Sequence, residues 1–214
     1  MEEEKKEEKN NNSKQILLAV LGVAVLIVAV VGVSFAVFSY YGEGQVVNTI
    51  STGTITMSFN EPENGISIEN AVPITEEEGK VLSGDNEKFD FTVTCKITGS
   101  TTVNYEVVAV KDETSTISDD QIRLYLESSS DGATYAQKTA PTKYVPITEK
   151  DSFGAPVGSM VIDSGSFTAS STQNSGVEQK VYYRLRMWVD SSYNVTDVSS
   201  NYKVKVNVYG KGVN

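Results

Sequence analysis

The chain has 214 residues, with 28 acidic side chains against 18 Lys and Arg, a formal net charge of -10, and no histidine. The acidic balance argues against nucleic acid as a partner, because phosphate binding needs clustered Lys and Arg. The lack of histidine removes the commonest general base, the commonest zinc ligand and every Ser-His or Cys-His pair, so we expect no enzymatic activity.

The N-terminus combines a polar lead with a long apolar segment. Residues 1–15 are rich in Glu and Lys and end near an asparagine run, which is typical of a solvated cytoplasmic lead. From Ile16 to Tyr41 no residue is charged, and about 20 apolar residues suffice to cross a bilayer as a helix. Four lysines precede this segment and no Lys or Arg follows it before Lys80, so the positive-inside rule places the rest of the chain outside the membrane.

Residues 16–36 fit two fates, a cleaved signal peptide or a retained transmembrane helix. The apolar segment is longer than the signal-peptide core of about 7 to 15 residues, which favours retention. Ser34 and Ala36, however, place small residues at the minus-three and minus-one positions of a signal-peptidase site. Both fates stay open, and both make the membrane and signal peptidase at least transient partners and place the domain on the extracellular side.

Residues 37–214 are expected to form one extracytoplasmic domain. Apolar and polar residues alternate with period two between Gly, Asn, Asp and Ser clusters, which predicts strands joined by turns. Short strands with one polar face predict an all-β fold, a jelly-roll or Ig-like antiparallel β-sandwich preceded by the N-terminal hydrophobic helix. The strand patterns cover Ile55–Phe59, Phe89–Ile97, Val103–Val110, Ile122–Leu126, Met160–Ile162, Val181–Val189 and Tyr202–Val208.

The segments between these strands show no convincing amphipathic helix. Ser128–Gly132, Thr148–Gly158 and Ser164–Gly176 are polar and rich in Gly and Ser, and we interpret them as loops. The one cysteine, Cys95, lies in an alternating strand and is expected to be a buried structural thiol. The alternative is a thiol that couples two chains.

Two surface features are candidates for binding. Tyr182, Arg184, Arg186 and Trp188 share one face of a predicted strand, which could form an aromatic and basic surface for glycan or protein or be covered by a loop. Acidic residues cluster in several turns, where oxygen ligands could hold calcium, although the spacing fits no EF-hand and solvated turns are the simpler interpretation. These turns contain Asp112 and Glu113, Asp119 and Asp120, Asp131, and Asp190 to Asp197. We otherwise expect no cofactor.

Three short motifs, in order, resemble the TasA and camelysin family of exported bacterial proteins. The first is the apolar segment ending in Ser34-Phe35-Ala36-Val37-Phe38-Ser39, and the second is Asn48-Thr49-Ile50-Ser51-Thr52-Gly53-Thr54-Ile55-Thr56-Met57. The third is Val81-Leu82-Ser83-Gly84-Asp85, followed by Phe89-Asp90-Phe91, where serine replaces the proline usual in the family. The similarity covers roughly residues 16–95.

The resemblance implies a jelly-roll-like sandwich, export through a dedicated signal peptidase, and polymerisation with other copies into surface or biofilm-matrix fibres. It also implies that an N-terminal strand of one subunit completes the sheet of the next, with Phe38, Tyr40, Val46 and Val47 as the apolar side chains of the donor. The metalloprotease activity associated with camelysin-like proteins is not expected, because a zinc protease helix needs two histidines.

The sequence therefore supports two hypotheses. The first is an exported structural subunit that forms fibres or biofilm matrix by strand exchange. The alternative is a monomeric, membrane-anchored surface domain that binds glycan or protein like an adhesin.

Overall fold

The computed structural model describes residues 20–21, 23, 40–42, 48–50, 53–59, 65–69, 72–84, 87–170, 176–194 and 200–213. The chain divides into two compact units, Met1–Ser39 and Tyr40–Asn214. In the first unit Val20, Leu21 and Val23 are helical and exposed. Within the described residues, no helix is both long enough and apolar enough to span a bilayer. The predicted processing residues Ser34 and Ala36 lie outside this description.

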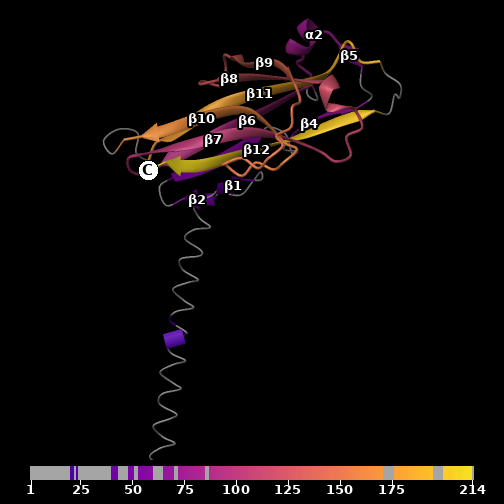
Figure 1. Ribbon diagram of the computed structural model, residues 1–214. Coiled ribbons are helices and arrows are strands. Elements are labelled where there is room, and N and C mark those ends of the chain that lie inside the picture. Colours follow the sequence, from indigo (N-terminus) through magenta and orange to yellow (C-terminus); the bar gives the residue numbers. More distant parts are fainter. Residues whose placement is uncertain are drawn as a thin grey trace, which may run out of the picture. The chain divides into compact units, whose positions relative to one another are not determined.

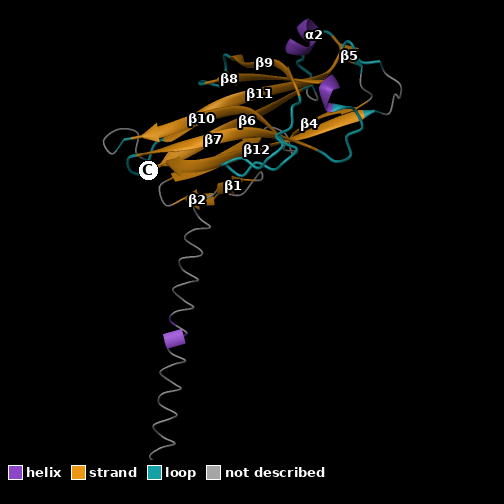
Figure 2. Ribbon diagram, viewed as in Figure 1, coloured by secondary structure: helices purple, strands orange, loops and turns teal. Residues whose placement is uncertain are grey.

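The described residues of the second unit lie mostly in strands, and one short α-helix and one 3-10 helix are found among them (Figures 1 and 2). The all-β class expected from the alternating pattern is confirmed. The early elements are β1 (Tyr40–Gly42), β2 (Asn48–Ile50), β3 (Gly53–Phe59), β4 (Gly65–Glu69), β5 (Pro73–Ile74) and α2 (Glu76–Lys80). The later elements are β6 (Lys88–Ile97), β7 (Thr101–Lys111), η1 (Asp119–Gln121), β8 (Ile122–Ser129), β9 (Ala136–Lys143), β10 (Met160–Ala169), β11 (Glu178–Asp190) and β12 (Asn201–Val213).

These strands form two sheets. The five-stranded sheet has the order β1-β12-β7-β10, with β4 also paired to β12. The seven-stranded sheet has the order β2-β3-β6-β11-β8-β9, with β5 also paired to β11. Among the described strands, every pairing is antiparallel except the two-residue pairing of β5 with β11. Most strands that pair are therefore not neighbours in the sequence, as in sandwiches with crossing connections.

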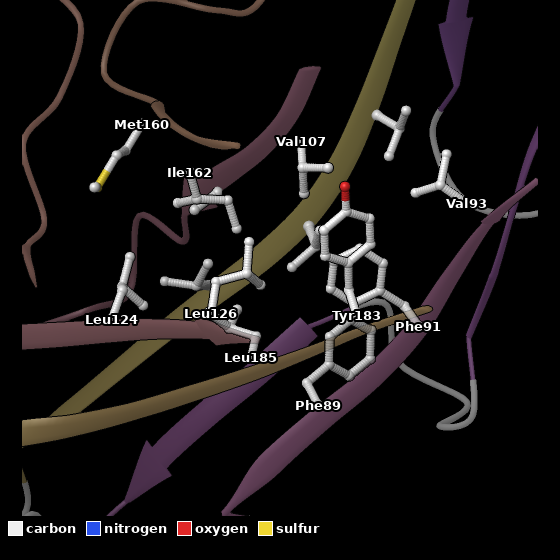
Figure 3. Packing of buried hydrophobic residues seen from close by; sticks show 14 of the residues in the cluster. Phe89, Phe91, Val93, Val107, Leu124, Leu126, Met160, Ile162, Tyr183 and Leu185 are labelled. Carbon is white, nitrogen blue, oxygen red and sulfur yellow. The ribbon is translucent and has the colours of Figure 1, made fainter. Parts of the chain in front are cut away.

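The inner faces of the two sheets enclose one hydrophobic core. In β6, Phe89, Phe91, Val93, Cys95 and Ile97 are buried, while the residues between them are more exposed. This period-two burial is the pattern that the sequence predicted, and it places Cys95 in the core. Residues of both sheets contribute to the cluster, and Figure 3 shows the Tyr183 hydroxyl directed toward the β7 side of the core, near Val107.

Three elements differ from the sequence-based expectation. The segment Ser164–Gly176 was expected to be a loop, but β10 continues from the predicted Met160–Ile162 strand through Ala169. The strand β9 and the helix α2 were not expected. β9 is an edge strand whose one partner in the described part of the chain is β8, and its polar residues do not alternate with apolar ones.

Candidate functional site

The outer edge of β12 is the first candidate site, because two short strands share it. β12 pairs with β7 from Val204 to Val213 along one edge. On the other edge β4 pairs with Asn201–Lys205 and β1 pairs with Val208–Gly210. The edge is therefore covered by two separate pieces of chain, each contributing only a few residues to the ladder.

The strand β1 lies within the segment that the family resemblance marks as a polymerisation strand. In this structure it pairs with the chain's own β12, with Tyr40 opposite Gly210 and Gly42 opposite Val208. Of the four residues expected to fill a neighbour's groove, Tyr40 belongs to β1, and Phe38, Val46 and Val47 lie outside the described residues.

β4 is fixed on the same edge by a close backbone approach. A Cβ atom at Gly65 would lie 2.0 Å from the carbonyl oxygen of Val204, so only glycine permits this contact. β4 is thus a close-fitting neighbour of β12, whereas β1 adds a ladder of only three residue pairs.

The outer face of β11 is the second candidate site. Tyr183, Leu185, Met187 and Val189 point into the core, and Tyr182, Arg184, Arg186 and Trp188 occupy the opposite face. The alternation agrees with the sequence-based prediction. The members of the outer set differ greatly in exposure, however, and this decides which of them a ligand could reach.

Trp188 is not accessible, which corrects the interpretation of it as part of an exposed surface. It is only 3% exposed, and the helix α2 packs on it. A Cβ at Gly79 would lie 2.3 Å from the Trp188 ring, so the helix needs glycine to lie this close. The helix begins with a capping box in which Thr75 accepts from the Glu78 N–H and the Glu78 carboxylate accepts from the Thr75 N–H.

Arg186 is also withdrawn from solvent, with 7% of its surface exposed. Its guanidinium donates to the carbonyl oxygen of Leu82 at 2.6 Å and forms an ion pair with Glu127 on β8. A buried guanidinium paired in this way holds the chain after α2 against the sheet, and two of its nitrogen atoms are already engaged.

Arg184 and Tyr182 remain on the half-buried part of this face. The Arg184 guanidinium makes two hydrogen bonds to the Asp90 carboxylate, at 2.7 and 2.9 Å, and lies 4.1 Å from the centre of the Tyr135 ring. Burial acts to raise the pKa of Asp90, but the hydrogen bonds and charges of Arg184 and Lys88 outweigh it and hold that pKa below its ordinary value.

The Tyr182 ring lies on the turn after β8, where a Cβ at Gly132 would be 3.2 Å from the ring. Gly132 has a φ of +73°, so glycine is favoured there by conformation as well as by space. Tyr182, Tyr135 and Arg184 thus form a small aromatic and basic cluster, which we call the β11 patch. Tyr135 and Asp90 were not predicted as site residues, because their proximity depends on strand register.

The acidic turns engage their carboxylates locally. Asp131 accepts from the backbone N–H groups of Ala133 and Thr134, both at 2.9 Å, and from the Ser129 hydroxyl at 2.7 Å. These bonds lower the pKa of Asp131 to about 2. Asp112 and Asp190 accept similar bonds from Thr114 and Ser192. Within the described part of the chain, no group of three or more Cys, Asp or Glu side chains is placed to hold a metal ion.

Comparisons with known proteins give little further information. No protein-family model matches the chain, and no curated protein matches it. The chain is similar to a solved carbohydrate-binding module, TmCBM61 in complex with β-1,4-galactotriose, at 7% identity and a TM-score of 0.23, over 73% of this chain and 86% of that one.

Two further solved structures show likeness at the same level. The module CpGH89CBM32-5 from Clostridium perfringens, in complex with GalNAc-β-1,3-galactose, has 11% identity and a TM-score of 0.25, over 73% of this chain and 94% of that one. AvmM, which catalyses macrocyclization in alchivemycin A biosynthesis, has 10% identity and a TM-score of 0.28, over 82% and 97%. TM-scores this low support no inference about the fold or ligand of this chain.

Proposed function

We propose that this chain is an exported structural protein with a jelly-roll-like sandwich, whose copies assemble into a cell-surface fibre or matrix by exchanging the strand β1. The observation that carries the proposal is the position of β1. It is a three-residue strand at the outer edge of β12. An edge strand of this kind can be replaced by the same strand from another copy without changing the ladder.

The proposed route to the cell surface rests on the N-terminal sequence. The lysines before the apolar segment favour a cytoplasmic N-terminus, and residues 16–36 would insert in the membrane and be cleaved after Ala36 or retained. Assembly into a free fibre requires cleavage, because a retained helix would tether the exchanging strand. Intact mass of the protein recovered from the producing cell surface tests this step, and a chain that still begins at Met1 would contradict a free fibre.

Strand exchange can be tested with a disulfide between β1 and β12, placed by the register of these two strands. Tyr40→Cys and Gly210→Cys place two thiols on residues that face each other across this pairing. In an assembled sample under oxidising conditions we expect covalent multimers in denaturing gels, because the two thiols of each bond come from different chains. Cross-linked monomers alone, in a sample that contains fibres by electron microscopy, would contradict the proposal. The single variant Tyr40→Cys is the matched control.

The β11 patch supports a second candidate function, in which a membrane-anchored monomer binds glycan or protein. Tyr182, Tyr135 and Arg184 lie together and half-exposed, and aromatic and arginine side chains dominate the energetics of many interfaces. A glycan array probed with the exported domain tests this function. Binding that Tyr182→Ala abolishes and that the exposed variant Lys180→Ala retains would favour it, and the absence of binding to any glycan on the array would count against it.

A further inference from the structure

The segment 144–159 covers part of the five-stranded sheet on the side away from the core. Ile147, Phe153 and Ala155 of this segment pack with Val108, Val110, Val161 and Tyr209 in a small second hydrophobic cluster, separate from the one between the sheets. The side chains of β7 alternate, so Val108 and Val110 face outward where Val107 and Ala109 face the core. We call segment 144–159 the β9–β10 cover.

Both ends of the cover are fastened by hydrogen bonds. The Ile147 N–H donates to the Ser159 carbonyl at 2.7 Å, and the Gly158 N–H donates to the Ile147 carbonyl at 3.0 Å. The Tyr144 hydroxyl lies 2.9 Å from the Gly158 carbonyl oxygen, and it accepts from the Lys111 N–H at 3.1 Å. These bonds fasten both ends of the cover, and a separate set of bonds, centred on Asp151, holds its middle.

One of the two carboxylate oxygens of Asp151 accepts hydrogen bonds from the backbone in the middle of the cover. Its Oδ1 atom accepts from the backbone N–H groups of Phe153, Gly154 and Ala155, at 2.9, 2.7 and 2.9 Å. Its Oδ2 atom is buried and has no hydrogen-bond partner while both carboxyls are ionised, and the same is true of Oε2 of Glu106 on β7. Two carboxyl groups can satisfy such oxygens by bonding to each other only if one of them carries a proton.

Glu106 has no cationic register partner on either neighbouring strand, and the lysine that shares its face of the sheet two residues after Tyr209 on β12, Lys211, is exposed. The register partners of Glu106 are Tyr209 on β12 and Ser164 on β10, and the neighbouring Asp163 turns to the other face, where it accepts from the Tyr183 hydroxyl. In the cover, Glu149 and Lys150 are exposed. Among the described residues, no ion pair involves Glu106 or Asp151.

This arrangement shifts the pKa values of the two carboxyl groups in opposite directions. Burial, together with the hydrogen bond to Asp151 and its charge, raises the pKa of Glu106 to about 7. Burial also acts to raise the pKa of Asp151, but the hydrogen bond from Glu106 and those from the three backbone N–H groups hold it below its ordinary value. Glu106 is therefore the partner that carries the proton.

We propose that the β9–β10 cover is a pH-operated lid on the outer face of the five-stranded sheet, closed by a proton shared between Glu106 and Asp151 and opened when both carboxyls are ionised. Opening removes Phe153 and Ala155 from Val108 and Tyr209 and exposes an apolar strip on β7 and β12. Closure is complete well below neutral pH and is lost as the pH rises through about 7, because the closed form binds the extra proton.

The test is amide hydrogen exchange of the whole chain, measured for the cover at about pH 5.5 and about pH 8.5 and corrected for the intrinsic exchange rate. We expect protection of the Phe153, Gly154 and Ala155 amides to fall by roughly tenfold or more at the higher pH. Glu106→Gln keeps a hydrogen-bond donor for Asp151 and has no charge, so its protection should stay high at both values. Glu149→Gln removes one exposed charge from the same cover and should behave like the wild type.

Equal protection of the wild-type cover at both pH values would overturn the proposal, as would an equal loss in Glu106→Gln. Should Glu106→Gln fail to fold, the titration of the Glu106 side-chain carboxyl by carbon NMR in the wild type decides. A midpoint below about 5.5 contradicts a shared proton.

Discussion

The position of Cys95 in a core-facing strand makes its thiol unreactive. It lies in the middle of β6 with no exposed surface, and burial raises the pKa of its thiol to about 12. The thiolate is the reactive form, so we expect no labelling by iodoacetamide in the native protein at neutral pH and complete labelling in urea. Mass spectrometry measures both states. Disulfide-linked dimers formed by the native protein would show instead that Cys95 couples two chains.

The Tyr183 hydroxyl links two other polar side chains in the core. It donates to the Asp163 carboxylate at 2.7 Å and accepts from the Tyr105 hydroxyl, 2.8 Å away. Tyr183→Phe removes both bonds and leaves buried polar oxygens without a partner, so we expect the free energy of unfolding to fall by about 1–3 kcal/mol. Urea denaturation measures it.

The matched control for this change is the neighbouring tyrosine. Tyr182→Phe makes the same chemical change one residue earlier on β11, on the half-exposed outer face. We expect a change below about 0.5 kcal/mol there. An equal loss in both variants would mean that the buried link contributes nothing specific to stability.

The helix α2 can lie close to Trp188 because residue 79 is glycine. Gly79→Ala would place a methyl group within 2.3 Å of the Trp188 ring, so either the helix lifts or the ring moves. We expect a loss of about 1–3 kcal/mol, together with a red-shifted tryptophan emission as water reaches the ring. Trp188 is the single tryptophan of the chain, so its fluorescence reports on this contact alone. Glu77→Ala, on an exposed position of the same helix, should leave the emission unchanged.

The strands that could be predicted from the sequence are those in which apolar and polar residues alternate. β6, β11 and β12 alternate because one face of each packs on the core, and this is visible in any window of a few residues. β9 is an edge strand with Pro141 and two lysines, features that protect an edge and hide its strand character. α2 has five residues, too few for a helical period, although the Thr75 and Glu78 capping box marks its start.

The candidate sites could be predicted only in part, because they depend on pairing between distant strands. The sequence placed Tyr182, Arg184, Arg186 and Trp188 on one face correctly. It could not show that Asp90, 94 residues away, would pair with Arg184, or that Gly79 would allow a helix to cover Trp188. Alternation gives the face of a residue, whereas register and covering elements decide its exposure.

At the scale of the whole molecule, carboxyl groups of two kinds set the response to pH. Asp90, Asp112 and Asp190 have pKa values below their ordinary value, so their contribution to stability is present above about pH 4 and is lost as the pH falls. For Asp112 and Asp190 the first cause is a hydrogen bond from Thr114 or Ser192, and for Asp90 the ion pair with Arg184 overcomes burial. Glu106 acts in the opposite direction, because its pKa is raised.

The lowered pKa values of these aspartates and the raised pKa of Glu106 together predict that the free energy of unfolding is largest in mildly acidic solution. Between about pH 4.5 and 7 the native state binds a proton at Glu106 that the unfolded chain releases, so stability falls as the pH rises through this window. We expect a loss of about 1 kcal/mol between pH 5 and 8, after allowing for screening by water at this partly exposed group. The formal charge of -10 acts in the same direction, since self-repulsion weakens as carboxyls gain protons.

Urea midpoints measured from about pH 3 to 8 on dilute protein test this prediction. The wild-type midpoint should rise from pH 8 to a maximum near pH 5 and fall again toward pH 3, where the aspartates take up protons. Glu106→Gln should flatten the limb between pH 5 and 8, and Glu149→Gln should keep it. A wild-type midpoint that climbs steadily from pH 5 to 8 would show that Glu106 is ionised in the native fold, and that the acidic surface does not limit its stability.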